Sequence, residues 1–184
     1  MINLGPDERI YLFKRIHPIL LKLWLLPYLL ILLFIFLSVL FFFFYKISWP
    51  VFVLEKFSEV SKFKLNFIFA FFLSLTLPFF WSLIFLEITK YYLTYWVVTN
   101  ERIIEARMIG FFNIQYSSVE LEKIQDMRVL VKGFLPSFFH FGDLIIQTAA
   151  EKGEFILEKI DNPELAKQVI FEAKIDYEKT KNYD

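Results

Sequence analysis

The chain has 184 residues, of which 57% are hydrophobic and 25 are phenylalanine, more apolar side chains than the core of one soluble domain requires. It contains no cysteine, which excludes disulfides, thiolate metal sites and a thiol nucleophile, and its two histidines are too few for a multi-histidine metal site. Eight basic and four acidic residues lie in residues 1–86, against twelve and sixteen in residues 87–184, so a positive apolar half precedes a negative polar half.

Two long uncharged segments predict membrane-spanning helices. The first, Leu23–Tyr45, has 23 residues, which at about 1.5 Å per residue are enough to cross a hydrocarbon core of about 30 Å. The second is Leu65–Leu86, and the charged residue Glu87 follows it. A signal peptide is the alternative for the first segment, but its apolar core would be shorter and would end in small residues, whereas aromatic residues and Lys46 follow here.

The segment between the two spans, residues 46–64, is short, so the spans form a hairpin and both termini lie on one side. Seven basic residues flank the spans on the side of the termini, and four lie in the loop between them. Because basic residues favour the cytoplasmic side, we expect a multi-pass protein of the cell membrane. Residues 1–22 and the domain after residue 86 are then cytoplasmic, and residues 46–64 form a short extracytoplasmic loop.

Small and polar residues recur every four positions in the second span, and they predict a face on which another helix packs closely. These residues are Asn66, Ala70, Ser74, Pro78 and Ser82. The face either seats the first span of the same chain or joins two copies of the chain. Neither span contains an acidic or basic residue or a histidine, so a proton relay or an ion pathway has no carrier.

After Lys90 the pattern changes to short β-branched and aromatic runs between turn residues, which predicts six or seven antiparallel strands. The expected strands are Tyr91–Val98, Arg102–Ile109, Phe112–Glu120, Ile124–Val131, Asp143–Thr148 and Glu154–Ile160. Asn162 and Pro163 fit the start of a final helix. Its expected apolar face consists of Ala166, Val169, Ile170, Ala173 and Tyr177. We expect residues 87–178 to form one β-rich domain, followed by a tail at residues 179–184.

Several short motifs resemble the bacterial pleckstrin-homology-like (PH-like) domain family, whose domains occur fused to membrane helices. The motifs are Val98–Ile104, Gly110 with Phe111, Leu121–Asp126, Phe141 with Gly142, Asp161–Pro163 and, upstream, Asp7–Arg9 with His17 and Pro18. Within them, the family-motif positions of interest are Thr99, Arg102, Ile124, Gln125, Asp126 and Gly142. The resemblance implies an α-helical transmembrane hairpin followed by antiparallel sheets that form a partly open barrel, capped by the C-terminal helix.

Eukaryotic relatives of this fold hold phosphoinositides in a basic loop between the first two strands. In this chain the corresponding turn, Thr99–Arg102, carries one cation, Arg102, beside one anion, Glu101. Sites for anionic lipids are built from clusters of basic residues. We therefore expect no tight binding of anionic headgroups.

The sequence predicts no active site. His140 lies between two phenylalanines, and no signature pairs it with Ser137 or Asp143 as a nucleophile and base. His17 and Pro18 fit the entrance to the first span, because proline is favoured in the first turn of a helix. We expect no enzyme activity, no cofactor, no metal, no nucleic-acid partner and no small-molecule substrate.

Residues 133–142 are rich in phenylalanine and are broken by glycine and proline. The rings belong to Phe134, Phe138, Phe139 and Phe141. Because water does not tolerate so many exposed rings together, they either cover an open end of the sheets as part of the core or contact a partner or the membrane surface.

Together these features predict a membrane-anchored PH-like module that binds or scaffolds proteins, or associates with itself, at the cytoplasmic face of the lipid bilayer. One alternative is a domain that senses lipid headgroups. Another is an auxiliary subunit of a larger membrane complex, which stable copurification with unlike chains would distinguish.

Overall fold

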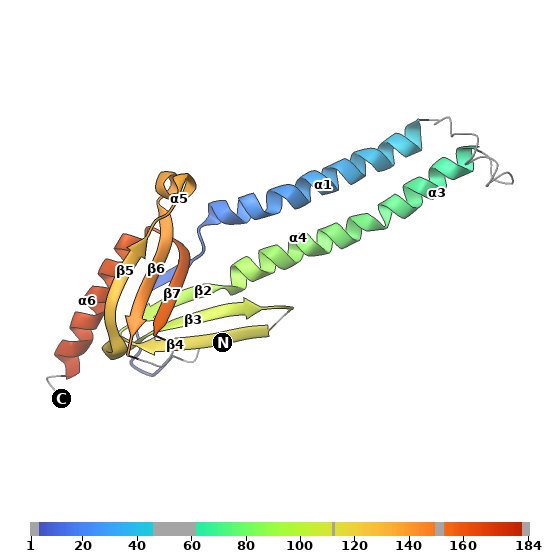
Figure 1. The fold of residues 1–184 in the computed structure, drawn as a ribbon. Helices are drawn as coiled ribbons and strands as arrows, with labels where there is room; N and C mark the ends of the chain where they lie inside the picture. The colour runs from blue at the N-terminus through green and yellow to red at the C-terminus, as the bar shows by residue number, and fades with distance from the viewer. Residues whose placement is uncertain (1–3, 46–61, 112, 150–152, 182–184) are drawn as a thin grey trace. The chain divides into compact units, whose positions relative to one another are not determined.

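The computed structural model describes residues 4–45, 62–111, 113–149 and 153–181 (Figure 1). The chain divides into two compact units. The helical unit comprises residues 21–88, and the sheet unit comprises residues 1–20 together with residues 89–184. The sheet unit is therefore assembled from both ends of the chain.

Long apolar helices make up the first unit and join it to the second. They are α1 (Pro18–Phe44), α3 (Lys62–Ser74) and α4 (Thr76–Leu93). Among the described residues, Pro18–Phe44 and Leu65–Leu93 are long and apolar enough to cross a membrane. In the most apolar stretch of each, only 6% and 11% of the residues are buried, whereas the core helix of a soluble protein is mostly buried.

Helix α4 continues to Leu93, beyond the charged residues that end the expected second span. Glu87 and Lys90 do not interrupt it, because both residue types have good helix propensity. The next strand therefore begins at Tyr95, and the expected strand start at Tyr91 is wrong.

The predicted packing face of the second span is buried at one end and exposed at the other. Asn66 and Ala70 are buried, whereas Pro78 and Ser82 are exposed. A spacing of four residues advances by about 400° around a helix, so each step drifts about 40° from the face on which the series began. Asn66 lies at the start of the series, and its Nδ2 donates to the carbonyl of Tyr45, at the end of α1, over 2.8 Å.

In the described part of the sheet unit, antiparallel strands form two sheets, one of four strands and one of three. Figure 1 shows their arrangement. The four-stranded sheet has the order β1 (Ile10–Arg15), β2 (Tyr95–Thr99), β3 (Arg102–Ile109) and β4 (Asn113–Glu120). The three-stranded sheet has the order β5 (Ile124–Leu130), β6 (Phe141–Thr148) and β7 (Glu154–Asp161). The 3₁₀ turn η1 (Leu121–Lys123) joins the sheets, α5 (Phe134–Phe139) lies between β5 and β6, and α6 (Pro163–Lys181) follows β7.

Strand β1 comes from the segment before the first apolar helix, which the sequence analysis did not predict to be a strand. It pairs antiparallel with β2, with Arg15 opposite Tyr95 and Phe13 opposite Val97. Leu12 and Ile16 pack against the core. The N-terminal segment is thus part of the folded sheet unit.

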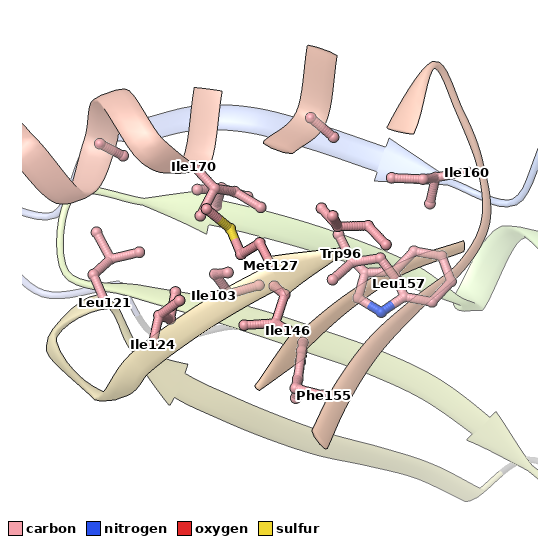
Figure 2. Packing of buried hydrophobic residues seen from close by; sticks show 14 residues of the cluster. Trp96, Ile103, Leu121, Ile124, Met127, Ile146, Phe155, Leu157, Ile160 and Ile170 are labelled. Atoms are coloured by element: carbon pink, nitrogen blue, oxygen red, sulfur yellow. The ribbon is translucent and has the colours of Figure 1, made fainter. Parts of the chain in front are cut away.

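The hydrophobic core contains side chains of both sheets and α6 (Figure 2). Its largest members include Trp96, Ile103, Leu144, Ile146, Leu157, Ile160 and Ile170. Helix α6 begins as expected, since Asn162 Oδ1 accepts a hydrogen bond from Leu165 N over 3.3 Å and Pro163 is the first helical residue. Ala166, Ile170 and Ala173 form its buried face, and the helix contacts β1, η1, β5 and β6.

The two sheets do not close into a barrel. Within the described ranges, an isolated bridge between Ile16 and Ile160 joins β1 to β7, next to a hydrogen bond of 2.8 Å from His17 N to the carbonyl of Lys159. Strand β4 is the last strand of its sheet, with β3 as its neighbour. Among the residues that the structure describes, no strand pairs with the other edge of β4.

Candidate functional site

The turn between β2 and β3 is tied to the N-terminal segment by a buried ion pair. Glu8 has a side-chain exposure of 0% and accepts two hydrogen bonds from the guanidinium of Arg102, each 2.9 Å long. Thr99 Oγ1 lies 2.8 Å from Glu8 Oε1 and accepts from Arg102 N over 3.0 Å. The hydrogen bonds from Arg102 lower the pKa of Glu8 to about 2, although burial opposes this shift.

The backbone of the N-terminal segment is hydrogen-bonded to the same turn through Asn100. Asn100 Oδ1 accepts from Arg9 N over 2.7 Å, and Asn100 N donates to the carbonyl of Arg9 over 3.1 Å. Asn100 Nδ2 also donates to the carbonyl of Asp7 over 3.2 Å. The turn that would correspond to a phosphoinositide loop is therefore hydrogen-bonded to residues 7–9 of the same chain. Its cation, Arg102, is paired with Glu8.

The other family-motif positions divide between the core and the surface. Ile124 is buried, and its carbonyl accepts from Lys174 Nζ over 2.7 Å. Gln125 and Asp126 are exposed, and Asp126 Oδ1 accepts from the backbone N of Met127 over 2.8 Å. The hydrogen bond from Lys174 joins α6 to β5, whereas that of Asp126 is local to β5.

Gly142 stands where the structure has no room for a side chain. A Cβ atom there would lie 2.8 Å from the carbonyl oxygen of Leu130 and 2.9 Å from Cγ2 of Val131. We expect Gly142→Ala to lower the free energy of unfolding by about 1 to 3 kcal/mol, as overpacking commonly does. Urea unfolding in mild detergent measures this loss. Gly5→Ala is the control, because a Cβ there makes ordinary contacts of 3.7 Å or more, and an equal loss in both variants would contradict the prediction.

A groove of about 820 Å³, which we call the intersheet groove, lies between β3, β4 and β7. Residues lining it include Glu105, Arg107, Gln115, Ser117, Glu154 and Glu158. Arg107 of β3 makes ion pairs of 2.8 Å with Glu105 and 3.0 Å with Glu158 of β7, and the second of these links the two sheets. Because β4 is an edge strand, the groove is bordered by backbone groups that can pair with another chain.

A second exposed feature is the aromatic tip, which we define as the exposed residues Val131, Phe134, Leu135 and Phe138 on and beside α5. Phe134 is 81% exposed and Phe138 is 63% exposed, so these two rings do not cover the core. The rings stack on each other with centroids 6.0 Å apart. The prediction that the rings of this segment cover an open end of the sheets as part of the core is therefore wrong for Phe134 and Phe138.

The other two phenylalanines of the segment lie against the residue that precedes α1. Phe141 is only 3% exposed and stacks on His17, with ring centroids 5.2 Å apart. Phe139 is half-buried, with its centroid 6.4 Å from that of His17. His17 Nδ1 accepts a hydrogen bond of 3.3 Å from Ile19 N, so His17 caps the start of α1. Phe141 is thus a buried residue and does not belong to an interaction surface.

Two antiparallel sheets packed around one core, with a C-terminal helix against them, define a PH-like fold. The family model described as "Bacterial PH domain" matches residues 18–174, and the chain therefore belongs to this family. The match begins at the first residue of α1, so it includes the apolar helices and strands β2 to β7 but not β1.

One similar solved structure is a DUF1696 family protein with a pleckstrin-homology domain from Shewanella loihica PV-4. It has 20% sequence identity to this chain and a TM-score of 0.37, and the similarity covers 44% of this chain and 70% of the other. No curated protein matches the chain.

Proposed function

We propose that this chain is a membrane-anchored binding or scaffolding module that holds a protein partner, or another copy of itself, at the cytoplasmic face of the membrane. A PH-like domain supports the general role of a binding module. The two long apolar helices and the excess of basic residues on the side of the termini support the anchoring and its orientation.

The edge of β4 beside the intersheet groove, with which no described strand pairs, is the observation that carries the binding role. An extended segment of a partner can add to such an edge through backbone hydrogen bonds, while the adjacent groove accepts its side chains. Tethering to a membrane raises the effective concentration of the domains, so a weak contact of this kind is sufficient. Headgroup sensing has less support, because Arg102 is paired with Glu8.

A positive charge introduced on the edge of β4 tests whether this edge binds a partner. Ser117 lies opposite Glu105 in the β3–β4 ladder, so the fold tolerates a lysine at position 117, whereas a lysine hinders the addition of another strand. We expect Ser117→Lys to abolish oligomers or partner complexes of the full chain purified in mild detergent. Light scattering and mass spectrometry measure this loss.

Gln168→Lys on the exposed side of α6 is the matched control and is expected to keep the assembly intact. Stable copurification of wild-type protein with unlike chains would favour the auxiliary subunit over self-association. Equal assembly of both variants and the wild type would contradict a role for the β4 edge.

A further inference from the structure

The outer edge of β4, on the side away from β3, lacks the features that usually keep the edge of a sheet from pairing. Natural edge strands are commonly protected by charged residues, proline or bulges. Residues 113–119 of β4 contain no charged residue and no proline, and the ladder between β3 and β4 runs from Asn113 to Glu120 in one continuous register. The outer edge of β4 is therefore suited to pairing with a further strand.

Apolar side chains reach this edge on the face of the sheet that alternates with the face lining the groove. Tyr116 of β4 lies opposite Ala106 of β3, which in turn lies opposite Tyr95 of β2. Ile114 lies opposite Met108 in the same way. Tyr116 is 47% exposed and Ile114 is 38% exposed. This apolar surface ends at the outermost described strand, and a strand added to β4 would remove more of it from water, which is favourable.

The edge is complementary to itself. If the β4 strands of two copies run antiparallel about a two-fold axis at Tyr116, Tyr116 of one copy faces Tyr116 of the other, and aromatic pairs of this kind stabilise antiparallel strands. On the groove side Gln115 then faces Ser117 of the second copy, so that an amide meets a hydroxyl. On the other face Ile114 lies opposite Ser118. No two like charges face each other along residues 113–119, because these residues carry none.

The charges of β3 favour this register over the adjacent ones. Glu105 lies opposite Ser117, and Arg107 lies opposite Gln115. With the axis at Tyr116, each row of side chains on the groove side therefore runs from Arg107 of one copy to Glu105 of the other. An axis at Ser117 would place both copies of Glu105 in one row, and an axis at Gln115 would do the same for Arg107. The pairing leaves the ion pairs that Arg107 makes within its own chain intact.

From this complementarity we infer that two copies of the chain pair through β4, with Tyr116 at the two-fold axis, and join their four-stranded sheets into one continuous sheet. The inference rests on the proposed function and names the partner at the β4 edge as a second copy. Both copies use the same surface in this contact, so the assembly closes as a dimer. Tethering in one membrane raises the effective concentration of the two edges.

Disulfide cross-linking tests this pairing, because the chain contains no native cysteine. The full chain is reconstituted in phosphatidylcholine vesicles and oxidised with copper phenanthroline, and dimers are measured on non-reducing gels. Residues directly opposite each other in adjacent strands are close to the spacing that a disulfide needs, whereas diagonal neighbours are farther apart. Tyr116→Cys places the cysteine at the axis. A mixture of Gln115→Cys and Ser117→Cys chains tests the same register and keeps the tyrosine pair. Gln168→Cys, on the exposed side of α6, is the matched control.

We expect Tyr116→Cys to form several-fold more dimer than Gln168→Cys. The mixture of Gln115→Cys and Ser117→Cys chains is likewise expected to form several-fold more dimer than either chain alone. Equal yields at all of these positions would indicate random collision and overturn the pairing. A maximum for Gln115→Cys or Ser117→Cys alone would overturn the axis at Tyr116.

The Ser117→Lys chain separates the failure of this inference from the failure of the proposed function. If no cysteine of β4 cross-links, but Ser117→Lys still abolishes complexes with unlike chains, self-pairing is overturned and the binding role of the edge stands. If no cysteine of β4 cross-links and Ser117→Lys changes no assembly, both the inference and the role of the β4 edge are overturned.

Discussion

Replacing Glu8 by alanine is expected to lower the free energy of unfolding of the sheet unit by about 3 kcal/mol or more. The change removes the buried carboxylate that accepts two hydrogen bonds from Arg102, and it also deprives Thr99 Oγ1 and Gly5 N of a hydrogen-bond partner. Urea titration of the full chain in mild detergent, followed by hydrogen exchange of the amides in β2, measures the loss.

Glu120→Ala is the matched control for this experiment. Glu120 makes an ion pair of 3.1 Å with Lys123, but both side chains are more than half exposed. Exposed pairs contribute about 0 to 1 kcal/mol, so the control variant is expected to unfold close to the wild type. Similar losses for Glu8→Ala and Glu120→Ala would contradict a stabilising role for the buried pair.

The same carboxyl group predicts how stability depends on pH. Its pKa falls from 4.5 to about 2 in the folded chain. A carboxyl group whose pKa is lower in the folded state than in the unfolded state stabilises the fold when the pH is above the unfolded-state pKa. This stabilisation is lost as the pH falls to the folded-state pKa. The stability difference between wild type and Glu8→Gln is therefore expected to narrow between about pH 4.5 and pH 2. A constant difference across this window would argue against the ionised pair.

The second large effect concerns the boundaries of the folded unit. A fragment of residues 87–184, the domain plus tail expected from the sequence, is predicted not to fold. It lacks β1, whose Leu12 packs on the core, and it lacks Glu8, the partner of Arg102. Losses of about 3 kcal/mol for the ion pair and several more for the strand approach the total stability of a small domain, about 5 to 15 kcal/mol. Circular dichroism and amide exchange report the outcome.

A joined chain is the control for this fragment. Arg15 and Tyr95 are opposite each other in the β1–β2 ladder, so residues 4–17 can be connected to residues 94–181 by a short flexible linker in place of the helices. We expect this chain to fold and to melt cooperatively. Cooperative folding of the 87–184 fragment without residues 4–17 would show that β1 is dispensable.

The apolar helices and most strands of the second half could be predicted from local patterns. Residues 102–109 form a short apolar-rich run bounded by Asn100 and Glu101 on one side and Gly110 on the other, and the structure has β3 over the same range, Arg102–Ile109. Asn162 and Pro163 also predicted the start of α6 correctly, because capping depends on residues that are close in sequence. The strand start at Tyr91 was wrong, since an apolar aromatic run at the end of a helix has the same local pattern as a strand.

The functional surfaces could be predicted only in part. The phenylalanine-rich segment was noticeable in the sequence, but its rings had two interpretations that composition could not separate. The structure separates them residue by residue, with Phe134 and Phe138 exposed and Phe141 buried against His17. The intersheet groove was not predicted, because its lining comes from β3, β4, β6 and β7, whose relative positions depend on the packing of the two sheets.

The sequence by itself therefore determined the division into an apolar half and a β-rich half, the order of most elements and the resemblance to the PH-like family. Each of these depends on the spacing of residues within one short segment, where the period of a helix or a strand is directly visible. Only the tertiary structure decided that Ile10–Arg15 becomes an edge strand and that Glu8 pairs with Arg102, which is 94 residues away. The physical reason is that a mixed segment such as Ile10–Arg15 acquires its strand conformation from the neighbour with which it pairs, and a buried carboxylate is stable only when folding brings a cation to it.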